Sequence, residues 1–146
     1  MDTNISLLHI LRGLGMIGAT VIVQAIFQII LTRVLERMPS PRRTQHLGTY
    51  GTTYIVVAVV ILAAGIVAEI NIWAVLYYTW GELGSYANCV YFALASFTTI
   101  GASDLSLSPA HRLVGAQESA IGMLMFGWTT ALMIEVISST RAAASA

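Results

Sequence analysis

The chain has 146 residues, of which 57% are hydrophobic and 10% are charged. This composition excludes an ordinary soluble domain and indicates a membrane protein. All seven basic residues are arginines, and seven acidic residues balance them. No basic run exists that could neutralise a nucleic-acid backbone, so nucleic acid is excluded as a partner. The single cysteine, Cys89, cannot form an intrachain disulfide.

The first apolar stretch covers residues 13–32 and contains no charged residue. At 1.5 Å per residue, a helix of about 20 residues spans the roughly 30 Å of membrane hydrocarbon. A cleaved signal peptide is the alternative. Asp2 is acidic where such peptides are basic, the apolar run is too long, and no small-residue cleavage site precedes Arg33. We therefore expect a membrane helix of the mature protein.

Residues 33–46 form a predicted polar loop, which Pro39 and Pro41 separate from the first helix. Most arginines lie on one side of the membrane in this arrangement: Arg33, Arg37, Arg42, Arg43 and, after the last span, Arg141. Only Arg12 and Arg112 lie on the other side. This bias predicts an outside N-terminus and a cytoplasmic C-terminus.

Two further spans are predicted. The second runs from residue 52 into the seventies and ends in aromatic residues expected at headgroup level: Trp73, Tyr77, Tyr78 and Trp80. The third follows Pro109, covers residues 111–137 and leads into a short tail.

Residues 86–107, between these two spans, are too few to cross the membrane twice. Ser85 is a good N-cap for a helix over residues 86–98, after which TTIGASDLSLSP predicts irregular backbone. Such backbone is tolerated at membrane depth only when it is buried in protein or lines water. The sequence thus predicts a re-entrant helix and loop. Three crossings enclose no aqueous pathway, so we expect several copies to assemble.

The segment TTIGASD at residues 98–104 resembles the pore-loop signature TTVGYGD of tetrameric potassium channels. YFALASF before it resembles their pore helix, and RLVGAQESAIGMLMFGW after it resembles the inner helix of small bacterial two-helix channels. The resemblance covers residues 86–134 and extends weakly through Glu69 and Trp73. It implies an all-α homotetramer in the inner (plasma) membrane. It also implies a pore module at residues 47–138, between a first helix and loop (1–46) and a short cytoplasmic tail (139–146).

By resemblance, main-chain carbonyls would replace the hydration shell of a permeating ion. The segment implied for this filter comprises Thr99, Ile100, Gly101, Ala102 and Ser103, with potassium or sodium held at Thr99, Ile100 and Gly101. Asp104 would form a carboxylate ring at the outer mouth and concentrate cations. No other cofactor is expected.

Two residues depart from the family signature. Ala102 stands where the family has tyrosine, which leaves a gap unless Trp80, Tyr91 or Phe92 fills it. Ser103 replaces the second glycine, and a left-handed backbone there would cost about 1–2 kcal/mol in each chain. We therefore expect intact inner sites, a wide outer vestibule and weaker discrimination of potassium from sodium than in the parent family.

A stripe at steps of four follows in the third span: Gly122, Phe126, Thr130 and Ile134. In the family, this stripe lines the cavity below the filter and the helix bends at the glycine. The alternative is that Gly122 marks close packing between helices. Among the membrane acids, Glu118 either hydrogen-bonds the pore helix or braces the filter from behind, or it is satisfied by backbone, and Glu69 is expected to brace the pore helix. Thr98 is also expected to support the filter.

Polar side chains elsewhere have simpler expected roles. Glu135 is expected to pair with Arg141 or a loop arginine rather than to ring the inner mouth. Gln24 and Gln28 are expected to join helices. His9, His46 and His111 lack metal-ligand spacing and are expected at the membrane interface. A serine hydrolase built on Ser103 and His111 would lack a third, orienting group, so no enzyme activity is expected.

No helix carries arginines at every third position, so a voltage sensor is not expected. Four alternatives remain for gating: gating by the filter, bending at Gly122, control by a separate regulatory subunit, or a permanently open pore. The sequence thus predicts a passive channel for monovalent cations, with lipids as its other partners. The rival hypothesis is a non-conducting, channel-like membrane scaffold or sensor.

Overall fold

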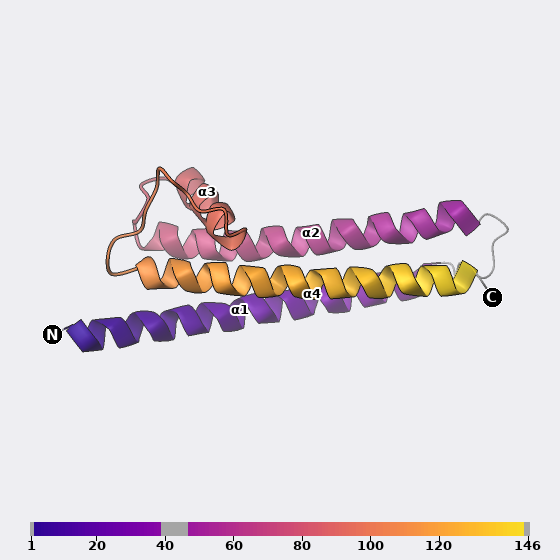
Figure 1. Cartoon of the computed structure of the whole chain (residues 1–146), viewed down its shortest axis with the longest axis horizontal. Helices are drawn as coiled ribbons and strands as arrows, with labels where there is room; N and C mark the ends of the chain where they lie inside the picture. The colour runs from indigo at the N-terminus through magenta and orange to yellow at the C-terminus, as the bar shows by residue number, and fades with distance from the viewer. Residues whose placement is uncertain (1, 39–46, 145–146) are drawn as a thin grey trace.

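The computed structural model describes the backbone of residues 2–38 and 47–144. Four helices make up this part of the chain: α1 (Asp2–Arg37), α2 (Leu47–Thr79), α3 (Tyr86–Phe97) and α4 (Arg112–Ala144). The three long helices run along one another, and the short α3 lies at the end where the N-terminus is found (Figure 1). The described residues contain no strand, so the predicted all-α class is confirmed.

Three of these helices are long and apolar enough to cross a membrane, over Ile10–Arg37, Gly51–Thr79 and Arg112–Ala142. The three predicted spans are confirmed, although each is longer than expected. The predicted start of the first loop at Arg33 is wrong, because α1 continues to Arg37. Arginine and glutamate favour helix, and the first residue that cannot continue it is Pro39. Pro39, Pro41, Arg42, Arg43 and His46 lie outside the described residues, as does the side chain of His9.

The short helix α3 begins and ends close to the predicted positions. Ser85 has φ −122° and ψ 152°, and its hydroxyl accepts a hydrogen bond from the Asn88 N–H at 3.2 Å. The helix ends one residue earlier than predicted, at Phe97. With 12 residues it is about 18 Å long, too short to cross a membrane. A helix followed by irregular backbone is the predicted re-entrant arrangement.

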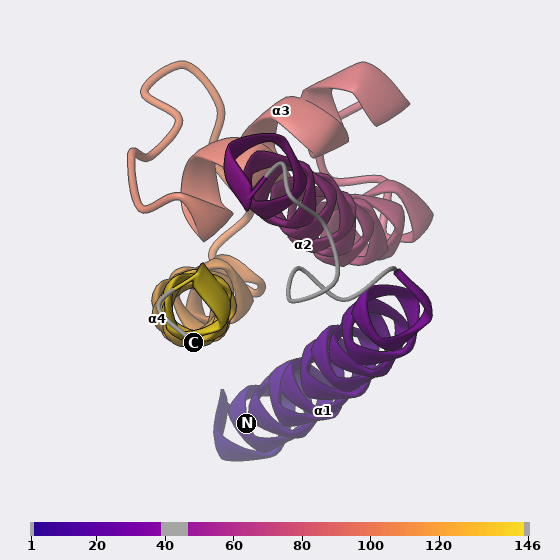
Figure 2. The ribbon, with the colours of Figure 1, turned by 90° about the vertical axis from the view of Figure 1, so that its right-hand side faces the viewer.

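The arrangement places α3 on one side of the bundle. Viewed from the end opposite α3, α1, α2 and α4 form the corners of a triangle (Figure 2). The helix α3 and the following loop lie over α2 and α4, on the side away from α1. The main hydrophobic core lies between α2, α3 and α4 and includes the buried side chains of Trp73, Tyr77, Phe92 and Phe97.

Polar contacts join α1 to the other two long helices. The Trp73 indole N–H donates to the Thr20 hydroxyl at 3.0 Å, and the Gln24 amide donates to the Thr129 hydroxyl at 3.1 Å. Gln28 accepts a hydrogen bond from the Trp128 indole at 3.1 Å. The prediction that Gln24 and Gln28 join helices is confirmed.

Two of the aromatic residues expected at headgroup level, Trp73 and Tyr77, are fully buried in the bundle, and their depth in the membrane stays a prediction. Their polar atoms find partners inside the bundle, so neither side chain requires the membrane interface. Tyr78 is 54% exposed, as an interfacial residue would be.

Candidate functional site

The chain turns back sharply where α3 ends. The N–H groups of Thr98, Thr99 and Gly101 donate to the carbonyls of Leu94, Ser96 and Ala95, respectively, at 2.9–3.0 Å. The Thr98 hydroxyl also donates to the Leu94 carbonyl, at 2.7 Å. These bonds hold residues 98–101 against the last turn of α3. Thr98 therefore supports the loop through its hydrogen bonds to backbone carbonyls of α3.

The signs of φ alternate along this turn. Thr99 has φ 61° and Gly101 has φ 79°, whereas Ile100 between them does not have a positive φ. Thr99 is the one non-glycine residue with positive φ in the described chain. A β-branched residue in this region is strained, by about 1–3 kcal/mol, and such strain concentrates at functional sites. Sequence reasoning missed this feature.

Ser103 has no positive φ, so it does not adopt the left-handed backbone that would be costly for a serine. Without a second glycine, the alternation of φ ends at Gly101, and the chain continues in a conformation that serine adopts readily. The strain is therefore located at Thr99 and not at Ser103.

The side chains of the loop differ in exposure. Ile100 is 82% exposed, and Gly101, Ser103 and Asp104 are exposed as well. Ala102 is half-buried and packs with Leu105 against the main core, which contains Phe92. Phe92 belongs to this core and Trp80 also packs against it, but the filling of the gap beside Ala102 by either ring stays a prediction. Tyr91 instead lies near Asp104, whose charge and side-chain hydrogen bond raise the pKa of the Tyr91 hydroxyl.

Gly122 of α4 packs directly against the end of α3. A Cβ atom at this position would lie 2.2 Å from the carbonyl oxygen of Phe97 and 2.9 Å from its carbonyl carbon. One turn further, the Phe126 ring meets the Phe97 ring edge-on, with centroids 5.9 Å apart. Of the two interpretations of Gly122, the structure bears out close packing; bending at this glycine stays a prediction.

Behind the loop, Glu118 of α4 and Tyr77 of α2 form a buried pair. The Tyr77 hydroxyl donates to Oε2 of Glu118 at 2.7 Å, and neither side chain is exposed. The Tyr77 ring packs edge-on against Phe92 of α3, with centroids 5.4 Å apart. Glu118 is thus satisfied by a side chain rather than by backbone, and it reaches α3 through Tyr77. Its Oε1 has no hydrogen-bond partner.

Glu69 is also fully buried, and neither of its carboxylate oxygens has a hydrogen-bond partner. It lies one helical turn from Gly65, which the Phe27 ring of α1 contacts, and one turn from Trp73, which bonds Thr20 of α1. Glu69 therefore shares the face of α2 that meets α1. No hydrogen bond of Glu69 reaches α3 in the described part of the chain, so its predicted role as a brace of α3 stays a prediction.

Four residues outside the predicted site connect the two ends of the loop segment; we call them the outer clamp. Glu82 accepts hydrogen bonds from the Ser108 N–H at 2.7 Å and the Ser108 hydroxyl at 2.8 Å. His111 Nδ1 bonds the same carboxylate, and the Trp80 ring stacks on His111 with centroids 4.1 Å apart. Partial burial raises the pKa of Glu82, but these hydrogen bonds outweigh it, and the pKa is lowered overall.

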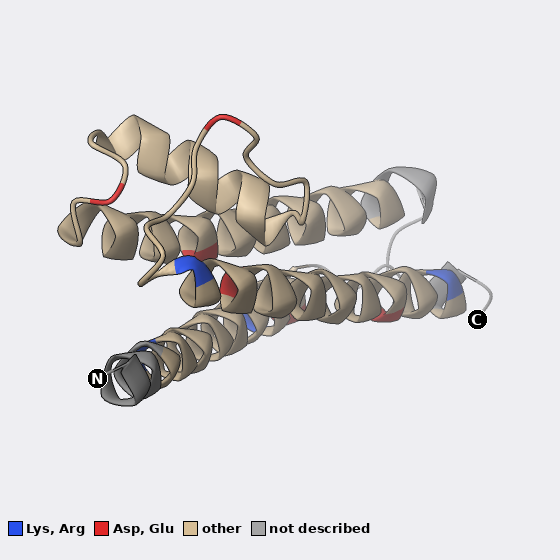
Figure 3. Ribbon diagram, turned by 60° about the vertical axis from the view of Figure 1, so that its left-hand side comes forward, with Lys and Arg blue, Asp and Glu red and all other residues tan. Residues whose placement is uncertain are grey.

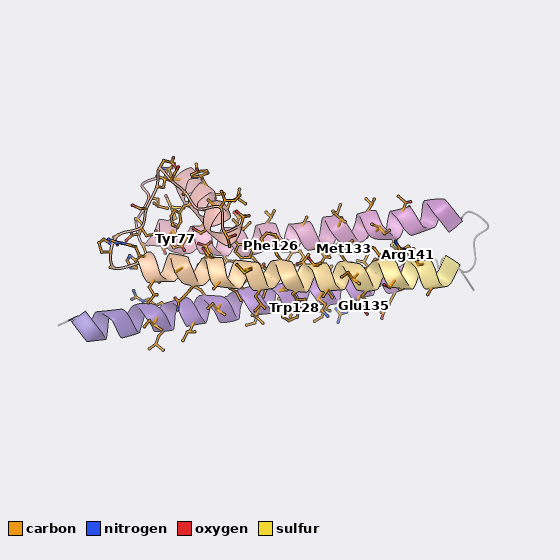
Figure 4. All side chains as sticks on the ribbon, in the orientation of Figure 1. Tyr77, Phe126, Trp128, Met133, Glu135 and Arg141 are labelled. Carbon is orange, nitrogen blue, oxygen red and sulfur yellow. The ribbon has the colours of Figure 1, made fainter. Side chains whose placement is uncertain are left out.

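The lower half of the predicted stripe faces outward. Phe126 is 37% exposed and Ile134 is 60% exposed, and Thr130 is exposed too. Glu135 does not pair with Arg141, because the two are labelled on opposite sides of α4 (Figure 4) and no ion pair to Glu135 is found in the described part of the chain. Six residues apart, they cannot share one face of a helix.

Acidic residues are few, and two acidic positions lie on the loops on either side of α3 (Figure 3). Within residues 10–38 and 51–142, no group of three or more histidine, cysteine or acidic side chains could hold a metal ion.

A family model described as "Ion channel" matches residues 54–139, which extend from α2 to α4 and include α3 and the loop. The helix α1 lies outside the matched range. Neither the search of curated proteins nor the search of solved structures found a match. Because the matched range exceeds half of the 146 residues, the chain belongs to this ion channel family.

Proposed function

We propose that the protein is a homotetrameric channel that conducts monovalent cations passively through a short filter of main-chain carbonyls. The observation that carries this proposal is the alternation of φ along Thr99, Ile100 and Gly101. In an ordinary extended strand, successive carbonyls point to opposite sides. A change in the sign of φ at every residue turns successive carbonyls toward the same side, as a filter requires.

The position of the loop supports assembly around an axis on the side away from α1 (Figure 2). Irregular backbone cannot face lipid, and an isoleucine that is 82% exposed at such a site calls for a protein neighbour. Each chain contributes one carbonyl per level, so four chains would surround an ion at Thr99, Ile100 and Gly101. Asp104 would then add four carboxylates at the mouth.

The end of the alternation at Gly101 supports weak selectivity. Ala102 turns toward the core and Ser103 lacks the left-handed backbone, so these two residues would form a wide vestibule rather than further sites. Fewer narrow levels give fewer places at which potassium is preferred over sodium. We propose that both ions permeate.

The remaining groups take supporting roles in this proposal. The exposed side chains of Phe126, Thr130 and Ile134 line the cavity below the filter, and the pair of Glu118 and Tyr77 holds α3 from behind. The N-terminus lies at the loop end of the bundle and Arg33 and Arg37 at the other, which supports an outside N-terminus in a bacterial inner membrane. No reaction is catalysed.

Flux through purified protein in liposomes tests the proposal. Wild-type protein should pass thallium down a gradient, and Gly101→Asp should abolish the flux because a side chain would obstruct the filter. Ser106→Asp is the control, since Ser106 is exposed on the same loop outside the filter. A wild type that folds and assembles but passes no ion would favour the scaffold hypothesis.

A further inference from the structure

A cavity lies between α1 and α4, on the half of the bundle away from the loop. Its volume is about 350 Å³, within the usual range for small-molecule sites. Four aliphatic side chains form its walls: Leu31 and Leu35 from α1, and Leu132 and Val136 from α4. Leu31 and Val136 are buried members of the second hydrophobic cluster, so the floor of the cavity is apolar and well packed.

Two carboxylates, Glu36 of α1 and Glu135 of α4, also line the cavity. Neither takes part in an ion pair within the described residues, and no arginine lines this cavity. Arg33 lies in the adjoining groove, which it shares with Glu36. The charge of Glu135, which projects toward α1 in Figure 4, is therefore the less compensated of the two.

We propose that this cavity binds an amphiphilic organic cation, an alkylammonium with a single chain. The ammonium group lies between Glu36 and Glu135, and the chain extends along the aliphatic walls toward the pair of Gln28 and Trp128. An anionic ligand is disfavoured by the two carboxylates, and a neutral alkyl chain leaves both of them without a partner.

The cavity is separate from the proposed ion pathway. It is formed in part by α1, which lies outside the range matched by the ion channel family. Occupancy of this site does not require conduction, so the proposal and the proposed channel function can fail independently.

Binding of tritiated octylammonium to the full chain, purified in an uncharged maltoside detergent, tests the proposal. We expect saturable binding of one octylammonium per chain, displaced by excess unlabelled octylammonium but not by octanol or octyl sulfate. The double variant Glu36→Gln, Glu135→Gln keeps the size of both side chains and should bind at least ten times more weakly.

Neighbouring serines provide a matched pair of filling variants. Ser139 lines the cavity, whereas Ser138 does not, and both are exposed. Ser139→Trp should weaken binding at least tenfold, and Ser138→Trp should leave it within twofold of wild type. Equal binding by the two tryptophan variants, or displacement by octanol as effective as by octylammonium, would overturn the proposal. Absence of saturable binding to wild type would overturn it too. A second copy of the chain that filled the cavity would give this result.

Discussion

The two halves of the helical bundle are built differently. At the loop end, thirteen buried residues from α2, α3, α4 and the loops form one core. The outer clamp and the pair of Tyr77 and Glu118 add polar contacts there. At the other end, the second cluster contains four buried residues among the side chains that the structure describes, and a cavity lies between α1 and α4.

This difference indicates where the chain is rigid and where it can move. A filter of main-chain carbonyls must be held within a fraction of an ångström of its working geometry, which a dense core with polar braces provides. Local opening is easiest where few apolar contacts hold the elements together. We therefore expect variants at the loop end to change permeation, and variants in the second cluster or at the contacts between α1 and α4 to leave it unchanged.

The largest effect is expected at Gly122. In Gly122→Ala the new methyl group clashes with the Phe97 carbonyl, so α3 must shift. Overpacking of this kind costs about 1–3 kcal/mol in each chain. Since about 1.4 kcal/mol corresponds to a factor of ten, thallium flux should fall roughly tenfold. Gly127→Ala on the same helix is the control, since nothing lies within 4 Å of the position. Equal flux in both variants would show that Gly122 does not position α3.

Removal of the Tyr77 hydroxyl is expected to have the next largest effect. Tyr77→Phe leaves both oxygens of the buried Glu118 without a partner, where the wild type has a hydrogen bond of 2.7 Å. A buried acceptor left unsatisfied in this way costs about 1–3 kcal/mol. Thermal unfolding in detergent measures the loss. The exposed neighbour Tyr78 supplies the control, Tyr78→Phe, which should unfold close to the wild-type temperature.

Two glycines with similar backbone conformation separate stability from permeation. Gly101→Ala and Gly81→Ala each place a Cβ on a residue with positive φ, 79° and 70°, and each should destabilise the chain by about 1–2 kcal/mol. Only Gly101 lies in the filter segment. The ratio of potassium to sodium permeability, from reversal potentials, should change in Gly101→Ala and not in Gly81→Ala. A change of the same size in both variants would show that residues 99–101 do not determine the permeability ratio.

A smaller effect is expected from the outer clamp and depends on pH. Because its hydrogen bonds lower the pKa of Glu82, the carboxylate stabilises the fold fully above about pH 4.5, the ordinary value for glutamate. This contribution is lost as the pH falls through the lower pKa of the folded state. The melting temperature of the wild type should therefore decrease more steeply below pH 4.5 than that of Glu82→Gln. Parallel curves would mean that the clamp contributes nothing.

The smallest effect is expected where α1 joins α4. Hydrogen bonds between membrane helices contribute about 0.6 kcal/mol on average. Gln24→Leu and Thr129→Val each remove the bond between these two side chains. The loss of stability in the double variant should therefore be smaller than the sum of the two single losses, and the difference is the coupling energy. Unfolding measurements on this double-mutant cycle give the coupling energy, and thallium flux should remain at the wild-type level. Loss of flux in Gln24→Leu would show that α1 acts on the filter.

Periodicity and capping predicted most of the fold. Hydrophobic length identified the three spans, and Ser85 identified the start of α3, because both signals depend on residues that are near in sequence. The partners of buried polar groups were not predictable in the same way. Tyr77 and Glu118 are 41 residues apart, and Glu82 and Ser108 are 26 apart, so no local pattern links them.

The candidate site was predicted only in part for a related reason. The signature at residues 98–104 identified the loop and suggested that its outer half relaxes at Ser103, but it did not reveal the strained backbone at Thr99. Strain in the family signature was inferred from the type of residue, while the conformation depends on how α3 and Gly122 hold the turn. The outer clamp had one visible signal, a glutamate and a histidine on the two loops that flank α3.

Density for heavy ions along a fourfold axis tests the central proposal most directly. An experimental map of the assembled protein in rubidium or thallium should contain four chains, with ion peaks on the axis beside the carbonyls of Thr99, Ile100 and Gly101. No ordered peak is expected beside Ser103. A different number of chains, or carbonyls of residues 99–101 that point away from the axis with no ion between them, would contradict it.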